Sequence, residues 1–187
     1  LGMAIIREHL AAKGLGLHND LQNEHSIVGN NVGLLLMLNY GTEEQKAEWV
    51  DDLAEGRRGF AFGITEPAHG SDATHMETYA ERDGDEWVIN GAKTWNTGIH
   101  KAQYDLVMAR TSGKPGDAEG ITAFLTPMNS EGLKIEEYLW TFNMPTDHGT
   151  VSFKNVRVPH ANIFGGEGRG LQIVQHFFNE NRIRQAA

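Results

Sequence analysis

The spacing of apolar and polar residues changes near Gly59 and again after Pro159. Before Gly59, apolar residues recur every three or four positions, which predicts helices that bury one face. From residue 59 onward, apolar and polar residues alternate with a period of two, which predicts strands. A glycine-rich stretch at residues 165–170 then leads into a final helix, whose apolar residues are Leu171, Val174, Phe177 and Phe178. The chain therefore has an α+β pattern, with helices on both sides of a β-rich centre.

Three helices are predicted before the strands. The first covers residues 2–13 and the second covers about residues 26–40, where apolar side chains lie nearly all round the helix, as in a buried helix. The third helix begins after Thr42. Thr42 and Gln45 have the spacing of a capping box, in which each side chain bonds to the backbone N–H of the other, and Gly56 ends this helix.

The β-rich centre is predicted to hold strands at residues 59–64, 75–82, 86–94, 104–110, 121–127, 133–137 and 150–158. Asp83-Gly84 and Asn90-Gly91 have the composition of hairpin turns, in which glycine adopts a positive φ. Many short strands without helices between them predict an antiparallel barrel or sandwich.

The composition is that of a globular protein and excludes several functions. With 187 residues, of which 40% are hydrophobic and 22% charged, the chain is long enough for one sizeable core or two small ones. A formal net charge of −9 disfavours binding to nucleic acid, which requires a basic surface. The absence of cysteine excludes disulfides and thiolate metal sites. The longest apolar run, Val32 to Leu38, is far shorter than the roughly 20 residues of a membrane span, so we predict no membrane-spanning segment.

The ends of the sequence favour a piece of a longer protein. The sequence starts at Leu1 within a helix-like pattern and stops at Ala187 without a residue that ends a helix. A targeting peptide is therefore not decided by these residues.

Two segments carry the residues most typical of a binding site. The first, residues 57–72, passes from alternating apolar residues into a loop with threonine, serine and glycine. Pro67 disfavours helix at the residue before it, and Gly63 and Gly70 allow the backbone to approach a bound group closely. The second, residues 87–98, contains a strand that ends in Trp-Asn-Thr-Gly. This pattern predicts two neighbouring β-segments whose ends bind one ligand.

Five motifs, found in sequence order, give the chain its resemblance to a known family. They are the Gly41–Lys46 helix start, the loop with Thr65-Glu66-Pro67 and Gly70-Ser71-Asp72, the Ile89–Lys93 segment, Trp95-Asn96-Thr97, and Phe153–Pro159 followed by Gly166-Glu167-Gly168. Together they resemble the FAD-dependent acyl-CoA dehydrogenases. The resemblance implies a multidomain α+β fold, with a partial N-terminal helical domain at residues 1–57, a central antiparallel β-barrel-like domain at residues 58–164, and the start of a C-terminal helical bundle at residues 165–187.

The resemblance also assigns binding residues. Those implied to contact FAD are Phe62, Ile64, Thr65, Gly70, Ser71, Trp95, Asn96 and Thr97, and those implied to contact acyl-CoA are Ser71, Asn179 and Arg182. In the family, the equivalents of Thr65 and Thr97 hydrogen-bond the flavin ring, and the equivalent of Trp95 packs on the ring face opposite the substrate. Hydrogen-bond donors suit this chemistry, because a ring that accepts a hydride gains negative charge. No metal site is implied.

The reaction implied by the resemblance removes the α-proton of an acyl thioester and transfers the β-hydrogen as hydride to flavin N5, which gives a trans-2-enoyl-CoA. The base is usually a glutamate of the C-terminal helical domain, which we expect beyond Ala187. Some relatives carry the base just before the arginine that matches Arg182, but this chain has Asn181 there, which cannot act as a base. Glu180 is no substitute, since adjacent helix residues point about 100° apart. No catalytic residue is therefore predicted here, with Arg182 as a candidate to support the base.

Each of these residues also has a simpler explanation when it is taken alone. Thr65 and Thr97 could be ordinary strand residues, and Trp95 could be a core aromatic. Ser71 is typical of turns, where its hydroxyl bonds to its own backbone. Their joint occurrence in the expected order favours the flavin site.

Other clusters carry weaker signals. Residues 143–149 depart from the glycine-arginine pattern of the family, and His148 among them is interpreted as an exposed turn residue. Residues 165–170 lack the glycine spacing of a dinucleotide-binding motif. The histidines and acids of residues 18–25 lack the spacing of a zinc protease, and residues 69–75 lack a nucleophile elbow. We interpret these as loop residues.

Two alternatives to the dehydrogenase stay open. The same fold could serve a related flavin monooxygenase or acyl-CoA oxidase, and a non-catalytic β-domain that binds a partner or acts as a scaffold would need no flavin. For the dehydrogenase, the resemblance implies acyl-CoA as substrate, electron-transferring flavoprotein as electron acceptor and a homo-oligomer, either dimer or tetramer. The expected compartment is the cytoplasm of a bacterium or the mitochondrial matrix of a eukaryote. Taken alone, residues 1–187 are expected to retain flavin weakly and to show no turnover.

Overall fold

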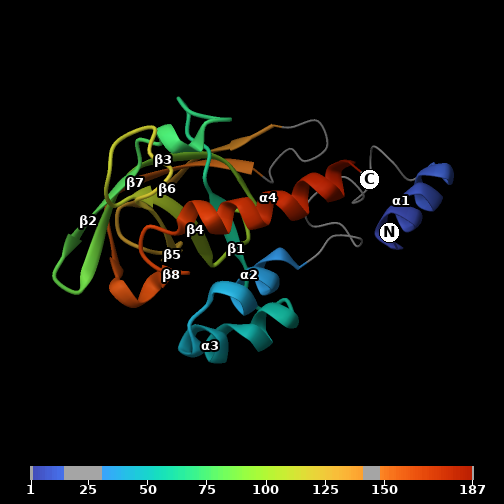
Figure 1. Ribbon diagram of the computed structural model, residues 1–187, viewed down its shortest axis with the longest axis horizontal. Helices are drawn as coiled ribbons and strands as arrows, with labels where there is room; N and C mark the ends of the chain where they lie inside the picture. The colour runs from blue at the N-terminus through green and yellow to red at the C-terminus, as the bar shows by residue number, and fades with distance from the viewer. Residues whose placement is uncertain (1, 15–30, 141–147, 187) are drawn as a thin grey trace.

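The computed structural model describes residues 2–14, 31–140 and 148–186 of the protein. Its helices are α1 (Gly2–Ala12), α2 (Val32–Tyr40), α3 (Glu43–Ala54) and α4 (Gly170–Ala186). Its strands are β1 (Phe60–Gly63), β2 (Tyr79–Asp83), β3 (Glu86–Thr97), β4 (Tyr104–Arg110), β5 (Ile121–Pro127), β6 (Leu133–Leu139), β7 (His148–Pro159) and β8 (Ile163–Phe164). Figure 1 shows the strands grouped together, with α4 running across them and α2 and α3 beside them. This is the predicted order of helices, strands and helix.

The described strands form one mixed sheet in which antiparallel pairs dominate. The order β6-β7-β3-β2-β4-β5-β8 runs across the sheet, and β1 pairs with β4. The β1–β4 pairing is parallel, as is the short contact between β2 and β4 at Tyr79 and Arg110. The predicted fold class, with a central β-domain between helices, is confirmed. The sheet is however neither purely antiparallel nor closed, because its path across the described strands begins at β6 and ends at β8.

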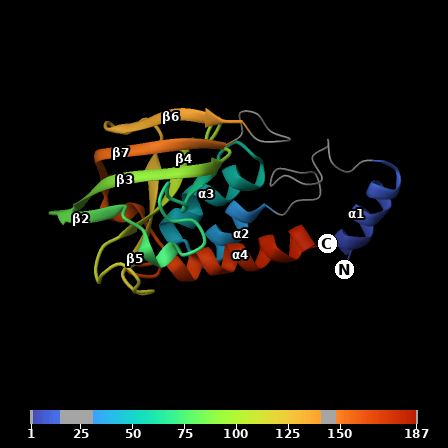
Figure 2. The same ribbon diagram turned by 90° about the horizontal axis from the view of Figure 1, so that it is seen from above.

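The central strands β4 and β5 are buried on both faces. In β4, Leu106 and Met108 face a cluster shared with α2, α3 and α4, whereas Val107 and Ala109 face a second cluster toward β3 and β7. Burial on both sides explains why these strands are near-continuous apolar runs in the sequence. Figure 2 shows the two sides, with α4 along one and the row β3, β7 and β6 along the other.

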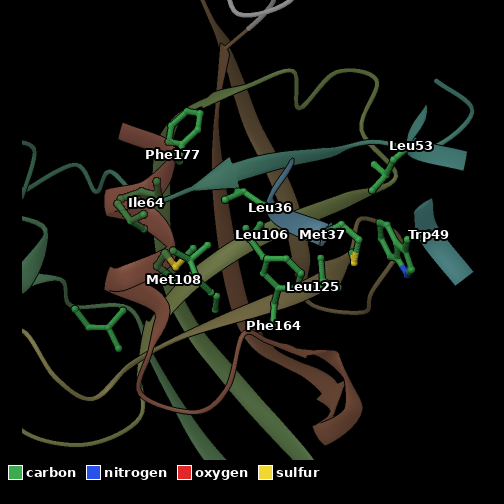
Figure 3. Close-up of a cluster of buried hydrophobic side chains, with 14 of the residues drawn as sticks. Leu36, Met37, Trp49, Leu53, Ile64, Leu106, Met108, Leu125, Phe164 and Phe177 are labelled. Carbon is green, nitrogen blue, oxygen red and sulfur yellow. The ribbon is translucent and has the colours of Figure 1, made fainter. Parts of the chain in front are cut away.

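The helices pack on the sheet through the first of these clusters. Figure 3 shows buried members from the helices and the strands in one cluster: Leu36 and Met37 of α2, Trp49 and Leu53 of α3, Phe177 of α4, and Leu106, Leu125 and Phe164 of the strands. Burial of one such large apolar side chain stabilises a protein by about 2 kcal/mol. This packing holds α4 against the end of β1, where the loop predicted to bind a ligand begins.

The helix predictions are confirmed for α3 and only in part for α2. The capping box is present, because Gln45 donates its N–H to Thr42 Oγ1 at 3.2 Å and Thr42 donates its N–H to Gln45 Oε1 at 3.1 Å. The prediction that α2 is buried all round is wrong, since Leu38 is 51% exposed and burial is confined to the side that carries Leu36 and Met37. The predicted start of this helix, residues 26–30, lies outside the described residues.

Of the two predicted glycine turns, one is confirmed and one is wrong. Gly84, with φ 63°, lies in the turn between β2 and β3. Asn90-Gly91 lies instead inside β3, where the pairing with β7 shifts register between Ile89 and Gly91. The φ of Gly91 is 144°, and a Cβ there would lie 2.4 Å from Thr78 Oγ1. The glycine is needed for this close approach, not for a chain reversal.

Strand β2 starts later than predicted because Asp72 caps a 3-10 turn, η1 (Ala73–His75), in front of it. Asp72 Oδ1 accepts from the Thr74 N–H at 3.0 Å. In the described ranges, no helix is both long and apolar enough to cross a membrane. The same ranges contain no group of three or more histidine or acidic side chains arranged to hold a metal ion. The acid- and histidine-containing residues 18–25 lie outside them.

Candidate functional site

The end of β1 is bound directly to β3. The backbone N–H of Thr94 donates to Thr65 O at 2.8 Å, and Lys93 Nζ donates to Ile64 O at 3.2 Å. These bonds join the two segments that the sequence predicted to bind one ligand. Thr65 lies beside β3 as a result, and Thr97 ends the same strand three positions after Thr94.

A buried ion pair holds the turn that follows Thr65. Lys93 Nζ donates to Glu66 Oε1 at 2.8 Å, and the two side chains are 0% and 4% exposed. Glu66 also accepts the backbone N–H groups of Thr78 at 2.9 Å and Glu77 at 2.6 Å. Although burial opposes it, the combined effect of Lys93 and these N–H groups lowers the pKa of Glu66. Glu66 is thus an ionised anchor, and the Thr65–Glu66 turn cannot shift without breaking these bonds.

Trp95 projects from a bulge in β3. The pairing of β3 with β7 shifts between Lys93 and Asn96, and Trp95 has φ 62°, a left-handed conformation that is costly for a large side chain. Its indole is 51% exposed and contacts the ring of His148 edge-on, with centroids 6.3 Å apart. The simpler explanation of Trp95 as a core aromatic is therefore wrong. His148 is half-buried at the start of β7, opposite Thr97, and is not the exposed turn residue that was predicted.

Asn96 points the other way and is fully buried. Its Nδ2 donates to Asp105 Oδ2 at 2.7 Å. Gly63 lies against the pair, so that a Cβ on Gly63 would be 2.9 Å from Asp105 Oδ2 and 3.3 Å from Asn96 Nδ2. Burial raises the pKa of Asp105 to about 7, although the charge of Lys93 and the bond from Asn96 act against this rise. The Asn96 side chain therefore bonds within the protein interior. Only the backbone of Asn96 is left to contact a ligand.

A line of aromatic contacts connects β1 to the helix with the predicted substrate residues. Phe62 stacks on Phe177 with ring centroids 4.4 Å apart and an interplanar angle of 13°. Phe177 contacts Phe178, and the Arg182 guanidinium lies 5.4 Å from the Phe178 ring centroid. Arg182 Nη1 also donates to Asn179 Oδ1 at 3.4 Å, and both residues are exposed. The structure thus brings Arg182 and Asn179 onto the same helix that covers Phe62.

Gly70 and Ser71 lie farther along the loop and are exposed. The loop is closed by paired backbone bonds, from the Glu66 N–H to His69 O at 3.1 Å and from the His69 N–H to Glu66 O at 3.2 Å. The bonds that tie this segment to β3 stop at Glu66, so no bond to β3 holds Gly70 or Ser71 among the described contacts, and their part in the site stays a prediction. Ile64, also predicted to contact flavin, is buried in the first hydrophobic cluster.

Sequence reasoning missed the buried charges beneath the site. Glu66 and Lys93 were recognised only as parts of motifs, and Asp105 was not singled out. A signal existed for Asp105, because it is a lone carboxylate next to the continuous apolar run Leu106–Ala109. A buried carboxylate in such a strand needs a polar partner, and here Asn96 of β3 supplies it.

The model of one protein family matches residues 61–156, which is the part of the chain that contains these strands. It is described as the acyl-CoA dehydrogenase middle domain. The chain belongs to the acyl-CoA dehydrogenase family. The family that was inferred from the five motifs is confirmed. The match lies within the β-domain predicted for residues 58–164, and the exact domain limits stay a prediction.

Individual acyl-CoA dehydrogenases support this assignment. The short-chain specific acyl-CoA dehydrogenase, mitochondrial, of Rattus norvegicus is 34% identical over 83% of the chain, which spans 38% of the relative. Acyl-CoA dehydrogenase family member 10 of Mus musculus is 38% identical over 79% of the chain, which spans 14% of that protein. The chain thus covers well under half the length of either relative.

Solved structures of acyl-CoA dehydrogenases have the same fold. A probable acyl-CoA dehydrogenase from Mycobacterium abscessus superposes with a TM-score of 0.76 at 29% identity, over 82% of this chain and 41% of that one. A glutaryl-CoA dehydrogenase from Mycobacterium smegmatis, solved in complex with FADH2, has a TM-score of 0.72 at 32% identity, over 83% of this chain and 39% of that one.

Proposed function

We propose that the full-length protein is an FAD-dependent acyl-CoA dehydrogenase that converts an acyl-CoA to the trans-2-enoyl-CoA, and that this chain supplies one wall of its flavin site. The observation that carries the proposal is the bond from the Thr94 N–H to Thr65 O. It brings the Thr65 loop to the strand that exposes Trp95. Family membership and a solved relative in complex with FADH2 support the choice of flavin as the ligand.

The residues at this edge suit a flavin ring. Trp95 offers an exposed indole on which a planar ring can stack, and its strained backbone conformation directs the indole away from the core. Thr65 and Thr97 are partly exposed and can donate hydroxyl hydrogens to ring nitrogen and oxygen atoms. Thr65 follows β1 closely and Thr97 is the last residue of β3, so both donors are fixed before a ligand binds. When bound, FAD supplies the acceptor for the hydride that leaves the β-carbon.

The charged and polar groups around the ring have separate tasks. The Glu66–Lys93 pair anchors the loop on one side. Because the two charges are paired with each other, we propose that the pair holds Thr65 in place and does not contact the ligand. Gly70 and Ser71 are proposed to approach the pyrophosphate and the CoA chain, since glycine allows close contact and the serine hydroxyl can donate to phosphate oxygens. Phe62, Ile64 and Asn96 are proposed to support the ring from behind through their packing.

On the substrate side, α4 presents Asn179 and Arg182. We propose that these residues contact the acyl-CoA, with Arg182 close to the catalytic base. The base removes the α-proton, and it is expected outside residues 1–187, because Asn181 cannot accept a proton. Electron-transferring flavoprotein as acceptor and a homo-oligomeric assembly are proposed from the family. One relative has "mitochondrial" in its name, and another comes from a bacterium. The relatives are therefore compatible with either expected compartment.

The test uses the full-length protein. We expect it to be purified with a flavin absorption band, and we expect acyl-CoA to bleach that band under anaerobic conditions. A panel of acyl-CoA chain lengths then gives the preferred substrate. As a matched pair, Trp95→Ala is expected to lose flavin, whereas Trp140→Ala, which alters a tryptophan that is 81% exposed directly after β6, the second strand from β3 in the sheet, is expected to keep it.

The other outcomes point to the alternatives. Bleaching followed by oxygen consumption and peroxide release would favour an oxidase or monooxygenase on the same fold. A protein that binds no flavin, and whose thermal stability does not change when FAD is added, would favour a non-catalytic β-domain. Equal flavin loss in both tryptophan variants would contradict the assignment of Trp95.

A further inference from the structure

Asn96 and Asp105 form a buried pair in which each side chain keeps one unsatisfied oxygen. Asn96 Nδ2 donates to Asp105 Oδ2 at 2.7 Å, and both residues are 0% exposed. Asn96 Oδ1 and Asp105 Oδ1 are also buried, and neither has a hydrogen-bond partner in the described structure. If Asp105 is ionised, both of these atoms are acceptors and cannot bond to each other. A buried acceptor without a donor is unfavourable, so the pair lacks one hydrogen.

The charges around the pair favour a neutral Asp105. Lys93 is the charged group that acts on Asp105, and its ammonium is already bonded to Glu66 Oε1 at 2.8 Å. On the strands that pair with β4 at this position, β1 places Gly63 against the carboxyl group, and β5 places the uncharged Thr126 opposite Asp105. With Glu66 ionised, an ionised Asp105 would put two carboxylates and one ammonium in a site hidden from water. Such an excess buried charge carries a large desolvation cost.

We propose that Asp105 is held as the neutral carboxylic acid and that its O–H donates to Asn96 Oδ1, so that the two side chains form a cyclic acid–amide pair. A protonated carboxyl group has one donor and still accepts at its other oxygen. The proton therefore satisfies both unpaired oxygens and leaves the bond from Asn96 Nδ2 intact. Burial raises the pKa of Asp105 to about 7, which is the direction that this protonation requires.

The pair connects the two segments that the proposed function assigns to flavin, and in this respect the inference rests on that function. Asn96 lies between Trp95 and Thr97 at the bulged end of β3. Gly63, at the end of β1, lies against both members of the pair. Loss of the proton would replace the second hydrogen bond by repulsion between two buried oxygens. Asp105 is thus a positioning residue, whose protonation fixes the β3 bulge relative to the flavin-facing loop.

The test compares the full-length wild type with Asp105→Asn, and uses Asp85→Asn, in the exposed turn before β3, as control. An amide at position 105 accepts from Asn96 Nδ2 and donates to Asn96 Oδ1 at every pH, so it imitates the neutral acid. We measure the Kd of FAD for the apoprotein between about pH 6 and about pH 8.5. In wild type and control, Kd should rise above about pH 7, approaching about tenfold per pH unit, the limit for one proton. In Asp105→Asn it should stay near the low-pH value of the wild type.

A second measurement reads the protonation without flavin. Infrared spectra of the apoprotein with isotope-labelled aspartate should contain the carbonyl band of a protonated carboxylic acid at about pH 6, where an aspartate of ordinary pKa, about 3.9, is ionised. The band should persist in Asp85→Asn and be absent from Asp105→Asn.

The two measurements separate the inference from the proposed function. If FAD does not bind at all, the proposed function fails, and the infrared band still decides the state of Asp105. A wild-type spectrum without the band overturns the inference, even if Asp105→Asn fails to fold. An Asp105→Asn protein with the same pH dependence of Kd as the wild type overturns the positioning role.

Discussion

Phe62 of β1 stacks face to face on Phe177 of α4, with centroids 4.4 Å apart and an interplanar angle of 13°. The contact ties the strand that precedes the loop proposed to bind flavin to the helix that carries Asn179 and Arg182. The proposed function brings flavin and acyl-CoA together, so it depends on the relative placement of these two elements. Five variants test whether the packing and the buried charges beneath it have the roles inferred above.

Phe177→Ala removes this stacked ring. Phe177 is buried in the first hydrophobic cluster, so we expect the variant to lose about 3–5 kcal/mol of stability, the range for large-to-small core substitutions. The melting temperature of the full-length apoprotein measures the loss. Phe177→Leu retains much of the buried area and should lose clearly less. Equal melting temperatures for wild type and Phe177→Ala would contradict the buried placement of this residue.

Lys93→Met breaks the buried ion pair. It leaves the Glu66 carboxylate without its cation, and removal of one partner from a buried pair costs about 3–5 kcal/mol. We expect a large fall in melting temperature and a parallel loss of flavin. Adding Glu66→Gln should restore part of the stability, since the remaining amide is uncharged. A double variant that is as unstable as the sum of the single variants would rule out direct coupling.

Gly63→Ala tests the close packing against Asn96 and Asp105. The added Cβ would lie 2.9 Å from Asp105 Oδ2, so the pair must shift, at a cost of about 1–3 kcal/mol. Gly59→Ala is the matched control, because a Cβ there meets nothing within 4 Å. Thermal melting of the apoprotein compares the two. A smaller effect at residue 63 than at residue 59 would contradict the packing.

Trp95→Gly separates stability from binding. Glycine adopts a positive φ without strain, so the unfolding free energy of the apoprotein should stay within about 1 kcal/mol of the wild-type value. The affinity for FAD should fall. Asn155→Gly is the control, since Asn155 has φ 52° on the exposed side of β7. It should leave FAD affinity unchanged. Titration with FAD and melting of the apoprotein give the two quantities, and retained affinity in Trp95→Gly would remove Trp95 from the site.

Asp105 also makes stability depend on pH. Burial raises its pKa from 3.8 to about 7 on folding, so the folded protein holds this proton more tightly than the unfolded chain. The stabilisation is fully present below about pH 4 and is lost as the pH rises through about 7. At about 1.4 kcal/mol per pKa unit, the loss approaches about 4 kcal/mol. Melting temperatures of wild type and Asp105→Asn across this range should diverge as the pH rises, and parallel curves would contradict the raised pKa.

Local features of the fold were predictable from the sequence alone. The Thr42–Gln45 capping box and the Asp83-Gly84 turn depend on residues that are close in sequence, and both are present. The prediction of a turn at Asn90-Gly91 was wrong. Gly91 is needed because the backbone there passes close to Thr78, the residue just before β2. The same composition favours a turn or a bulge, and only the neighbouring backbone distinguishes them.

The sequence by itself determined the family, the order of the elements and the identities of Thr65, Trp95 and Thr97 as site candidates, because ordered motifs carry that information. Tertiary structure alone decided that Asn96 turns inward to Asp105 and that Trp95 turns outward. It also decided that Lys93 pairs with Glu66. The reason is physical: these contacts depend on how the folded sheet brings β1, β3 and β4 together, and a shift of one residue in a strand reverses which side chains are buried.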